Sequence, residues 1–194
     1  MFYRIARLVL AIYYRLFYRM EIIGQENIPR QGGCILCANH TSVKDPMALA
    51  IMVKRSIHFI AKQELKSNKL FGLVLTWLNT VPVDRQNVNM STFKMVLDKL
   101  KEGKCIGIFA QGTRIKEIEA KDAKAGVALF AVKGNVPVVP ICISSTYKHF
   151  SKIYIHVGKP MSMEEYQGKK IKSAQLNEIT EKVMANIMAL HIPC

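Results

Sequence analysis

The alternation of short apolar runs with helical patterns constrains the fold more than any other feature of the sequence. Runs rich in β-branched residues predict strands, and longer segments with apolar residues every three or four positions predict helices. The predicted strands are 33–39, 57–62, 80–84, 105–110, 136–143 and 152–157, and the predicted helices are 46–54, 66–78, 91–102, 122–133 and 173–190. We expect an α/β domain with a mixed, largely parallel sheet flanked by helices. Functional residues are then expected in loops after the carboxyl ends of strands.

A basic and apolar pattern precedes the first predicted strand. On a helix its arginines fall within one arc of about 120°, and apolar residues lie opposite: Arg4, Arg7, Arg15 and Arg19 against Val9, Tyr13, Leu16, Phe17 and Met20. The longest uncharged stretch, Leu8 to Tyr14, is much shorter than the roughly 20 residues of a membrane-spanning helix. We expect an amphipathic membrane-interface helix over 1–22 and one domain over 23–194. The alternative is a helix packed on the core with a solvated basic face.

The charge balance predicts an anionic partner. The chain has 28 Lys+Arg against 14 Asp+Glu, a formal net charge of +14. Either nucleic acid or an anionic lipid surface would suit this excess. The sequence has no zinc-finger or basic-zipper spacing and no aromatic pattern of the RNA-stacking type. We therefore expect a membrane surface as the partner and no nucleic acid.

The cysteines favour a reducing compartment. There are 5 of them, an odd number that excludes a complete intramolecular disulfide framework. Cys34 and Cys37 form a C-x-x-C inside an apolar run, where strand alternation places them on opposite faces. This favours two small core residues over a metal or redox pair.

The loop after the first predicted strand contains the best candidate for chemistry, in the segment Asn39-His40-Thr41-Ser42-Val43-Lys44-Asp45-Pro46. An apolar strand ends at Ala38, and Pro46 suits the first position of a helix. His40 is therefore expected in the loop at the exit of the strand. A tight loop can place the Asp45 carboxylate on imidazole Nδ1 and leave Nε2 as a base for a hydroxyl nucleophile. The alternatives are a helix N-cap for Asp45 and a hydrogen-bonded loop histidine for His40.

Asn39, His40 and Asp45 also match N-H-x-x-x-x-D, the first motif of the glycerolipid acyltransferase family, which this sequence resembles. The family's other motifs have counterparts in the same order. These are Val81-Pro82-Val83-Asp84-Arg85 for the second, Gln111-Gly112-Thr113-Arg114 for the third, usually E-G-T-R, and the proline-bearing strand Val136-Pro137-Val138-Val139-Pro140-Ile141 for the fourth. The resemblance covers residues 39–141, more than half of the chain.

The resemblance implies an acyltransferase domain that acts in phospholipid biosynthesis. A fatty acyl group would move from acyl carrier protein or acyl coenzyme A to the free hydroxyl of 1-acylglycerol-3-phosphate, giving phosphatidic acid without an acyl-enzyme intermediate. No metal or other cofactor is expected. The protein would associate with the cytoplasmic face of a membrane as a monotopic enzyme. Alternatives are another lysolipid acceptor, a hydrolase in which His40 activates water, and a catalytically weakened membrane-binding homologue.

The candidate catalytic residues are His40, the general base, and Asp45, which orients it. The candidate substrate-binding residues are Lys62, Arg85, Gln111, Gly112, Thr113, Arg114 and Lys124. Arg85 and Arg114 would clamp the substrate phosphate, because a guanidinium offers a rigid fork to phosphate oxygens. Lys62 and the Gly112 N–H are candidates for stabilising the thioester oxyanion.

One position departs from the family pattern. Gln111 stands where the family usually has glutamate, so the side chain keeps a hydrogen-bonding carbonyl and loses the negative charge. If the carboxylate binds the glycerol part or orients Arg114, this change lowers activity. If it only accepts a hydrogen bond, glutamine serves equally well.

Overall fold

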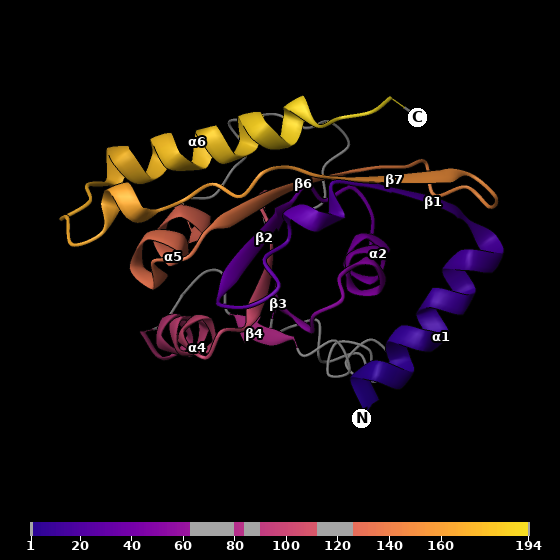
Figure 1. The fold of residues 1–194 in the computed structure, drawn as a ribbon, viewed down its shortest axis with the longest axis horizontal. Helices are drawn as coiled ribbons and strands as arrows, with labels where there is room; N and C mark the ends of the chain where they lie inside the picture. The colour runs from indigo at the N-terminus through magenta and orange to yellow at the C-terminus, as the bar shows by residue number, and fades with distance from the viewer. Residues whose placement is uncertain (1, 63–79, 84–89, 112–125, 194) are drawn as a thin grey trace.

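A sheet of seven strands lies at the centre of the computed structural model, which describes residues 2–62, 80–83, 90–111 and 126–193 (Figure 1). Its order is β1-β7-β6-β2-β5-β3-β4. The strands are β1 (Arg19–Ile23), β2 (Cys34–Ala38), β3 (Ile57–Lys62), β4 (Val81–Val83), β5 (Cys105–Phe109), β6 (Val138–Ser144) and β7 (Lys152–Val157). Only the β6–β7 pair is antiparallel in this part of the chain. The predicted mixed, largely parallel sheet is confirmed.

Helices cover both faces of the sheet. They are α1 (Phe2–Phe17), α2 (Asp45–Met52), α4 (Met90–Lys101), α5 (Gly126–Gly134) and α6 (Ser173–Ala189). Helices α1 and α2 pack with one set of buried strand residues, and α4, α5 and α6 pack with the other. Every residue of β2 is buried, as expected for a central strand covered on both sides. The helix predicted over 66–78 and the start of that predicted over 122–133 lie outside the described residues.

The two cysteines of the C-x-x-C motif face opposite layers of the core. Cys34 belongs to the cluster under α1 and α2, whereas Cys37 belongs to the cluster under α4, α5 and α6. Burial raises the pKa of the Cys37 thiol to about 12. The pair is therefore a pair of core residues, as the strand alternation predicts.

The N-terminal helix is shorter than the sequence pattern predicts. It ends at Phe17, and residues 19–23 form strand β1, which runs parallel to β7 from Arg19↔Lys152 to Ile23↔His156. The sheet therefore includes residues that the helical pattern assigns to the interface helix. The physical reason is that backbone hydrogen bonding to the edge of β7 that does not pair with β6 outweighs the weak local preference of these residues for a helix.

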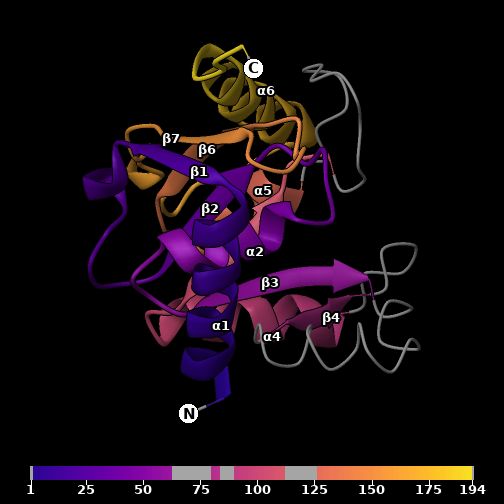
Figure 2. The same cartoon turned by 90° about the vertical axis from the view of Figure 1, so that its right-hand side faces the viewer.

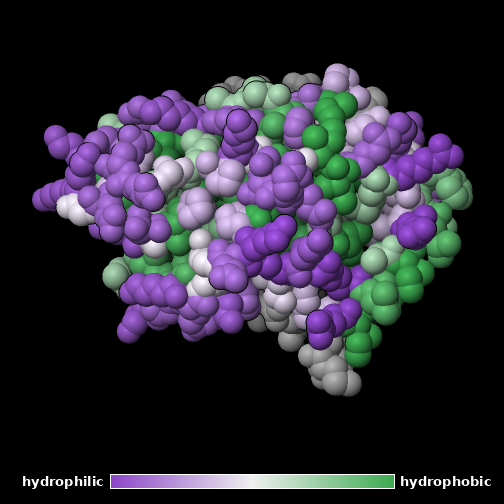
Figure 3. Space-filling model, in the orientation of Figure 1, coloured by the Kyte–Doolittle hydropathy of each residue, from purple (hydrophilic) through white to green (hydrophobic). Residues whose placement is uncertain are grey.

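Helix α1 has two apolar sides. One side packs against α2 through buried side chains such as Tyr14, which is 1% exposed. The other side faces outward from the sheet (Figure 2), and its exposed apolar residues form a stripe along the helix (Figure 3). The stripe consists of side chains that are 50–64% exposed: Ile5, Leu8, Val9, Ile12 and Leu16. No helix in the described part of the chain is long and apolar enough to cross a membrane.

Candidate active site

Asn39 anchors the loop between β2 and α2. Its side chain is 1% exposed, Nδ2 donates to the Ile143 carbonyl at 2.8 Å, and Oδ1 accepts the Ile143 N–H at 2.7 Å. The side chain thus continues the pairing of β2 with β6 one step beyond the last strand residue. This contact fixes the point at which the main chain leaves the sheet, immediately before His40.

His40 and Asp45 meet within this loop. Nδ1 of His40 lies 2.9 Å from Oδ2 of Asp45, and Asp45 is fully buried. The same oxygen accepts the backbone N–H groups of Thr41 at 2.8 Å and Ser42 at 2.7 Å. Asp45 is the first residue of α2, one position after the N-cap Lys44, and its carboxylate accepts hydrogen bonds from the preceding loop. The predicted orientation of imidazole by carboxylate is therefore present, and the simple N-cap alternative is not.

The His40 ring is held on its face as well as at its edge. It stacks on Phe109, with ring centroids 4.1 Å apart and planes 23° apart, and 15% of the side chain is exposed. An ionised carboxylate only accepts hydrogen bonds, so Nδ1 bears the proton and Nε2 has the free lone pair. An imidazole in this state can accept a proton at Nε2 while the carboxylate stabilises the imidazolium.

Gln111, two residues beyond the end of β5, supports the same histidine. Its Oε1 accepts the His40 backbone N–H at 3.1 Å, and the residue is 2% exposed. Its Nε2 is buried and has no hydrogen-bond partner within the described residues. The side chain therefore acts on His40 as an acceptor, a role that glutamate and glutamine share.

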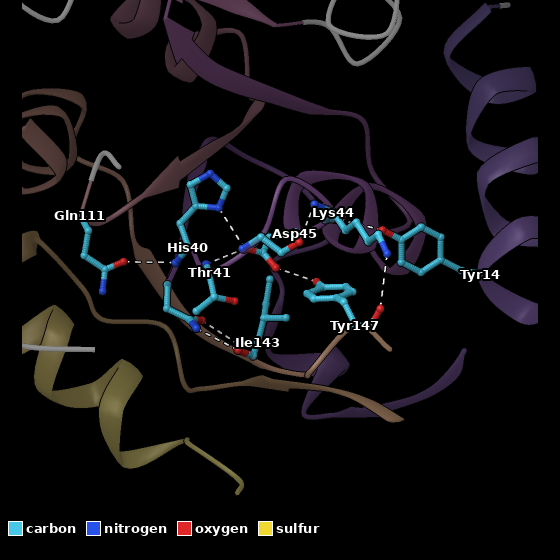
Figure 4. Close-up of polar contacts among 10 residues, drawn as sticks. Tyr14, His40, Thr41, Lys44, Asp45, Gln111, Ile143 and Tyr147 are labelled. Carbon is cyan, nitrogen blue, oxygen red and sulfur yellow. Dashed lines mark hydrogen bonds and ion pairs between the residues drawn. The ribbon is translucent and has the colours of Figure 1, made fainter. Parts of the chain in front are cut away.

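Asp45 is also bound from the far side of the loop. The Tyr147 phenol donates to Oδ1 at 2.6 Å, so His40, Asp45 and Tyr147 form a line of contacts (Figure 4). Burial raises the pKa of Tyr147 well above its usual value, and the negative charge of Asp45 adds to the effect. The phenol therefore remains a protonated donor at neutral pH.

Lys44 connects the loop that contains His40 and Asp45 to the N-terminal segment. Its ammonium donates to the Tyr18 hydroxyl at 2.6 Å and to the Tyr147 carbonyl at 3.4 Å. It also lies over both tyrosine rings, 5.2 Å and 5.7 Å from their centroids. The Tyr14 hydroxyl donates to the Lys44 carbonyl at 2.8 Å, which connects the buried side of α1 to the loop (Figure 4).

Comparison with known proteins shows to which family this chain belongs. A model of the family described as Acyltransferase matches residues 19–144, which contain the whole loop from His40 to Asp45. The chain belongs to the acyltransferase family. It is 31% identical over 153 residues to 1-acyl-sn-glycerol-3-phosphate acyltransferase of Bacillus subtilis, covering 76% of this chain and 76% of that protein. It is 25% identical over 179 residues to the protein of the same name from Borreliella burgdorferi, covering 85% and 72%.

A solved structure shares the fold of this acyltransferase. The crystal structure of the 1-acyl-sn-glycerophosphate acyltransferase from Thermotoga maritima aligns with a TM-score of 0.73 and 24% sequence identity. The alignment covers 97% of this chain and 78% of that chain. The expected α/β architecture is thus the fold of a known acyltransferase.

The predicted site residues follow the carboxyl ends of neighbouring parallel strands. His40 follows β2, Gln111 follows β5, and Lys62 is the last residue of β3. Strand β4, which precedes Arg85, lies beside β3. Because carboxyl ends of parallel strands share one edge of a sheet, the ends of these four strands lie on the same side of the acyltransferase.

Several predicted side chains lie outside the described residues. These are Arg85, Gly112, Thr113, Arg114 and Lys124. For Lys62 only the position at the end of β3 is described. Their proposed contacts with substrate therefore remain predictions.

Sequence reasoning missed Tyr147. The residue lies 102 positions from Asp45 and belongs to no motif quoted above. The available signal was its place just after β6, the strand that pairs with β2. A polar aromatic residue at that strand end was a candidate for the same edge of the sheet as His40.

Proposed function

We propose that this acyltransferase moves a fatty acyl group from a thioester to the free hydroxyl of 1-acylglycerol-3-phosphate, giving phosphatidic acid. The relatives from B. subtilis and B. burgdorferi are named for this acceptor. The observation that carries the proposal is the 2.9 Å contact between His40 Nδ1 and the buried Asp45 carboxylate. It prepares a base for a hydroxyl nucleophile without requiring a nucleophilic side chain of the protein.

In the proposed step, Nε2 of His40 takes the hydroxyl proton as the hydroxyl oxygen attacks the thioester carbonyl carbon. The C–O bond of the new ester forms, the C–S bond breaks, and the leaving thiolate takes the proton from the imidazolium. Asp45 stabilises the charged ring during the transfer. Both substrates are bound together, so no acyl-enzyme intermediate forms. The thioester supplies the activated acyl group, and the reaction needs no metal or other cofactor.

Substrate binding is proposed for the residues that follow the parallel strands. Arg85 and Arg114 would hold the phosphate of the lysophospholipid as bidentate partners. Lys62 and the Gly112 N–H would stabilise the oxyanion, while Thr113 and Lys124 would contribute a hydroxyl and a charge. The acyl donor is proposed to be acyl carrier protein or acyl coenzyme A, and the formal charge of +14 suits an anionic donor and an anionic acceptor.

The outer side of α1 is proposed to dock on an anionic membrane. The apolar stripe is flanked by exposed Arg4 and Arg15, which suit the headgroup layer while the stripe enters the acyl boundary. Four of the five cysteines lie in the described part of the chain, and all four are free thiols: Cys34, Cys37, Cys105 and Cys142. Free thiols are typical of a reducing compartment, which supports docking on the cytoplasmic face.

The test is product detection by mass spectrometry with purified full-length protein in detergent micelles. Lysophosphatidic acid is offered with acyl carrier protein and coenzyme A thioesters in separate reactions. His40→Ala should lower the rate by about 10²–10⁴-fold, the usual contribution of a general base. His191→Ala is the matched control, because this histidine is exposed and lies beyond α6.

The outcomes separate the alternatives. Phosphatidic acid from the parent and from His191→Ala, but not from His40→Ala, supports the reaction and identifies the donor. Thioester consumption without lysophosphatidic acid would instead indicate a hydrolase. Absence of product with either donor from folded protein would contradict the proposed acceptor.

A further inference from the structure

The two oxygens of the Asp45 carboxylate accept different numbers of hydrogen bonds. Oδ2 accepts from His40 Nδ1 and from the backbone N–H groups of Thr41 and Ser42. Within the described residues, Oδ1 accepts only the Tyr147 phenol. A carboxylate can turn about its last torsion, because the wells of that torsion are broad. A donor on Oδ1 opposes this turn, since a fully buried oxygen would lose its partner.

Tyr147 is itself held in place by several contacts. Its backbone has φ 52, a left-handed conformation that bulky residues rarely adopt. Its N–H donates to Ser145 Oγ at 3.0 Å, and its carbonyl accepts the Lys44 ammonium at 3.4 Å. The ring also lies edge-on to Tyr18, with centroids 6.1 Å apart. The surroundings therefore determine where the phenol points.

The loop that holds Tyr147 is fastened to the end of α1. The Phe150 N–H donates to the Phe17 carbonyl at 2.7 Å, and the Arg19 N–H donates to the Ser151 carbonyl at 3.1 Å. These contacts join the β6–β7 loop to the segment between α1 and β1. The position of the phenol thus depends on three elements: α1, the β2–α2 loop and the β6–β7 loop.

We propose that Tyr147 is a positioning residue whose phenol fixes the Asp45 carboxylate and thereby the orientation of the His40 ring. This inference rests on the acyl transfer proposed above. Tyr147 touches neither the reacting atoms nor, in the proposed step, either substrate. It acts through Asp45, so its loss should slow the chemical step and leave substrate binding unchanged.

The first test compares Tyr147→Phe with the parent at full length in the same micelles. We expect kcat to fall about tenfold, in keeping with loss of a hydrogen bond to a buried charge. KM for lysophosphatidic acid and for the thioester should stay within about twofold. Tyr154→Phe is the matched control, because Tyr154 lies on β7 against Lys152, 5.5 Å from the ring centroid to Nζ, and should keep the parent kcat. An unchanged kcat in Tyr147→Phe, or a raised KM alone, would overturn the proposal.

A double-mutant cycle tests whether the effect passes through Asp45. Tyr147→Phe should add little to Asp45→Asn, because the group that the phenol holds is already altered. Independent, multiplying losses would overturn the proposal. Circular dichroism of each variant establishes that it is folded before rates are compared.

Proton NMR provides a readout that needs no substrate. The hydrogen-bonded Nδ1–H of His40 should give a downfield resonance that is missing in His40→Ala. In Tyr147→Phe this resonance should move or broaden, because the carboxylate that accepts the proton is less fixed. An unmoved resonance would overturn the positioning role. The NMR result stands even if lysophosphatidic acid is not the acceptor, so failure of this inference is distinguishable from failure of the proposed function.

Discussion

Replacing Gln111 with leucine removes the side-chain acceptor of the His40 backbone N–H while nearly keeping the volume of the side chain. Oε1 lies 3.1 Å from that nitrogen, and with the residue 2% exposed, water has little access to replace it. An unpaired buried donor costs about 1–3 kcal/mol. Leucine also removes the buried Nε2, which has no partner in the described part of the chain. This offset leads us to expect a net loss of about 1–2 kcal/mol of unfolding free energy.

Calorimetry and rate measurements check this expectation together. In a domain of this size 1 kcal/mol corresponds to about 2–4 °C, so the melting temperature of Gln111→Leu should fall by about 2–8 °C. The acyl transfer rate should fall too, because the main chain of His40 is no longer held from β5. Gln111→Glu is the matched variant, since a carboxylate oxygen accepts the same N–H. We expect its rate to lie within about threefold of the parent.

Two results would refute the reasoning. A rate raised by about a hundredfold in Gln111→Glu, or about 2.7 kcal/mol of barrier, would mean that the family's carboxylate does more than accept a hydrogen bond. Unchanged stability and rate in Gln111→Leu would mean that the bond to His40 contributes nothing measurable. The first result would favour the hypothesis that the glutamate usual in the family orients Arg114.

Two further predictions concern the membrane face and the buried tyrosines. Leu8→Asp, on the outward stripe of α1, should weaken co-sedimentation with anionic vesicles at least about tenfold, because burial of a leucine side chain contributes about 1.5–3 kcal/mol. The melting temperature in solution should not change, since Leu8 is 62% exposed, and unchanged vesicle binding would contradict docking by this stripe. Burial raises the pKa of Tyr14 and Tyr147 above the ordinary value of 10.0, so above that pH the unfolded chain binds fewer protons than the folded one. Stability that is complete below pH 10 should therefore fall as the pH rises further, and melting curves of the parent should show a steeper alkaline decline than those of the Tyr14→Phe, Tyr147→Phe double variant.

Local sequence patterns were sufficient to predict most strands of the sheet and the contact between His40 and Asp45. The runs 57–62 and 152–157 are strands with the predicted bounds, because apolar side chains at strand spacing have few other ways to be buried. The contact of His40 with Asp45 was predictable since only five positions separate the two residues. A short loop between a strand end and a helix start leaves the carboxylate few places other than the ring.

The N-terminal segment shows where local reasoning fails. The pattern over 1–20 is compatible with a helix throughout, yet residues 19–23 pair with β7. The amphipathic arc also does not reveal that α1 has an apolar side toward α2 and a second apolar side toward solvent. Both facts depend on what neighbours the segment meets in the folded chain.

The sequence by itself determined the fold class, the family motifs and the pairing of His40 with Asp45, because each depends on residues close together along the chain. Only the tertiary structure showed that Tyr147 donates to the Asp45 carboxylate and that Gln111 accepts the His40 N–H. These pairs are 102 and 71 positions apart in the sequence. These contacts exist because β6 and β5 lie on either side of β2. Strand order is set by the packing of the whole sheet, and no local pattern encodes it.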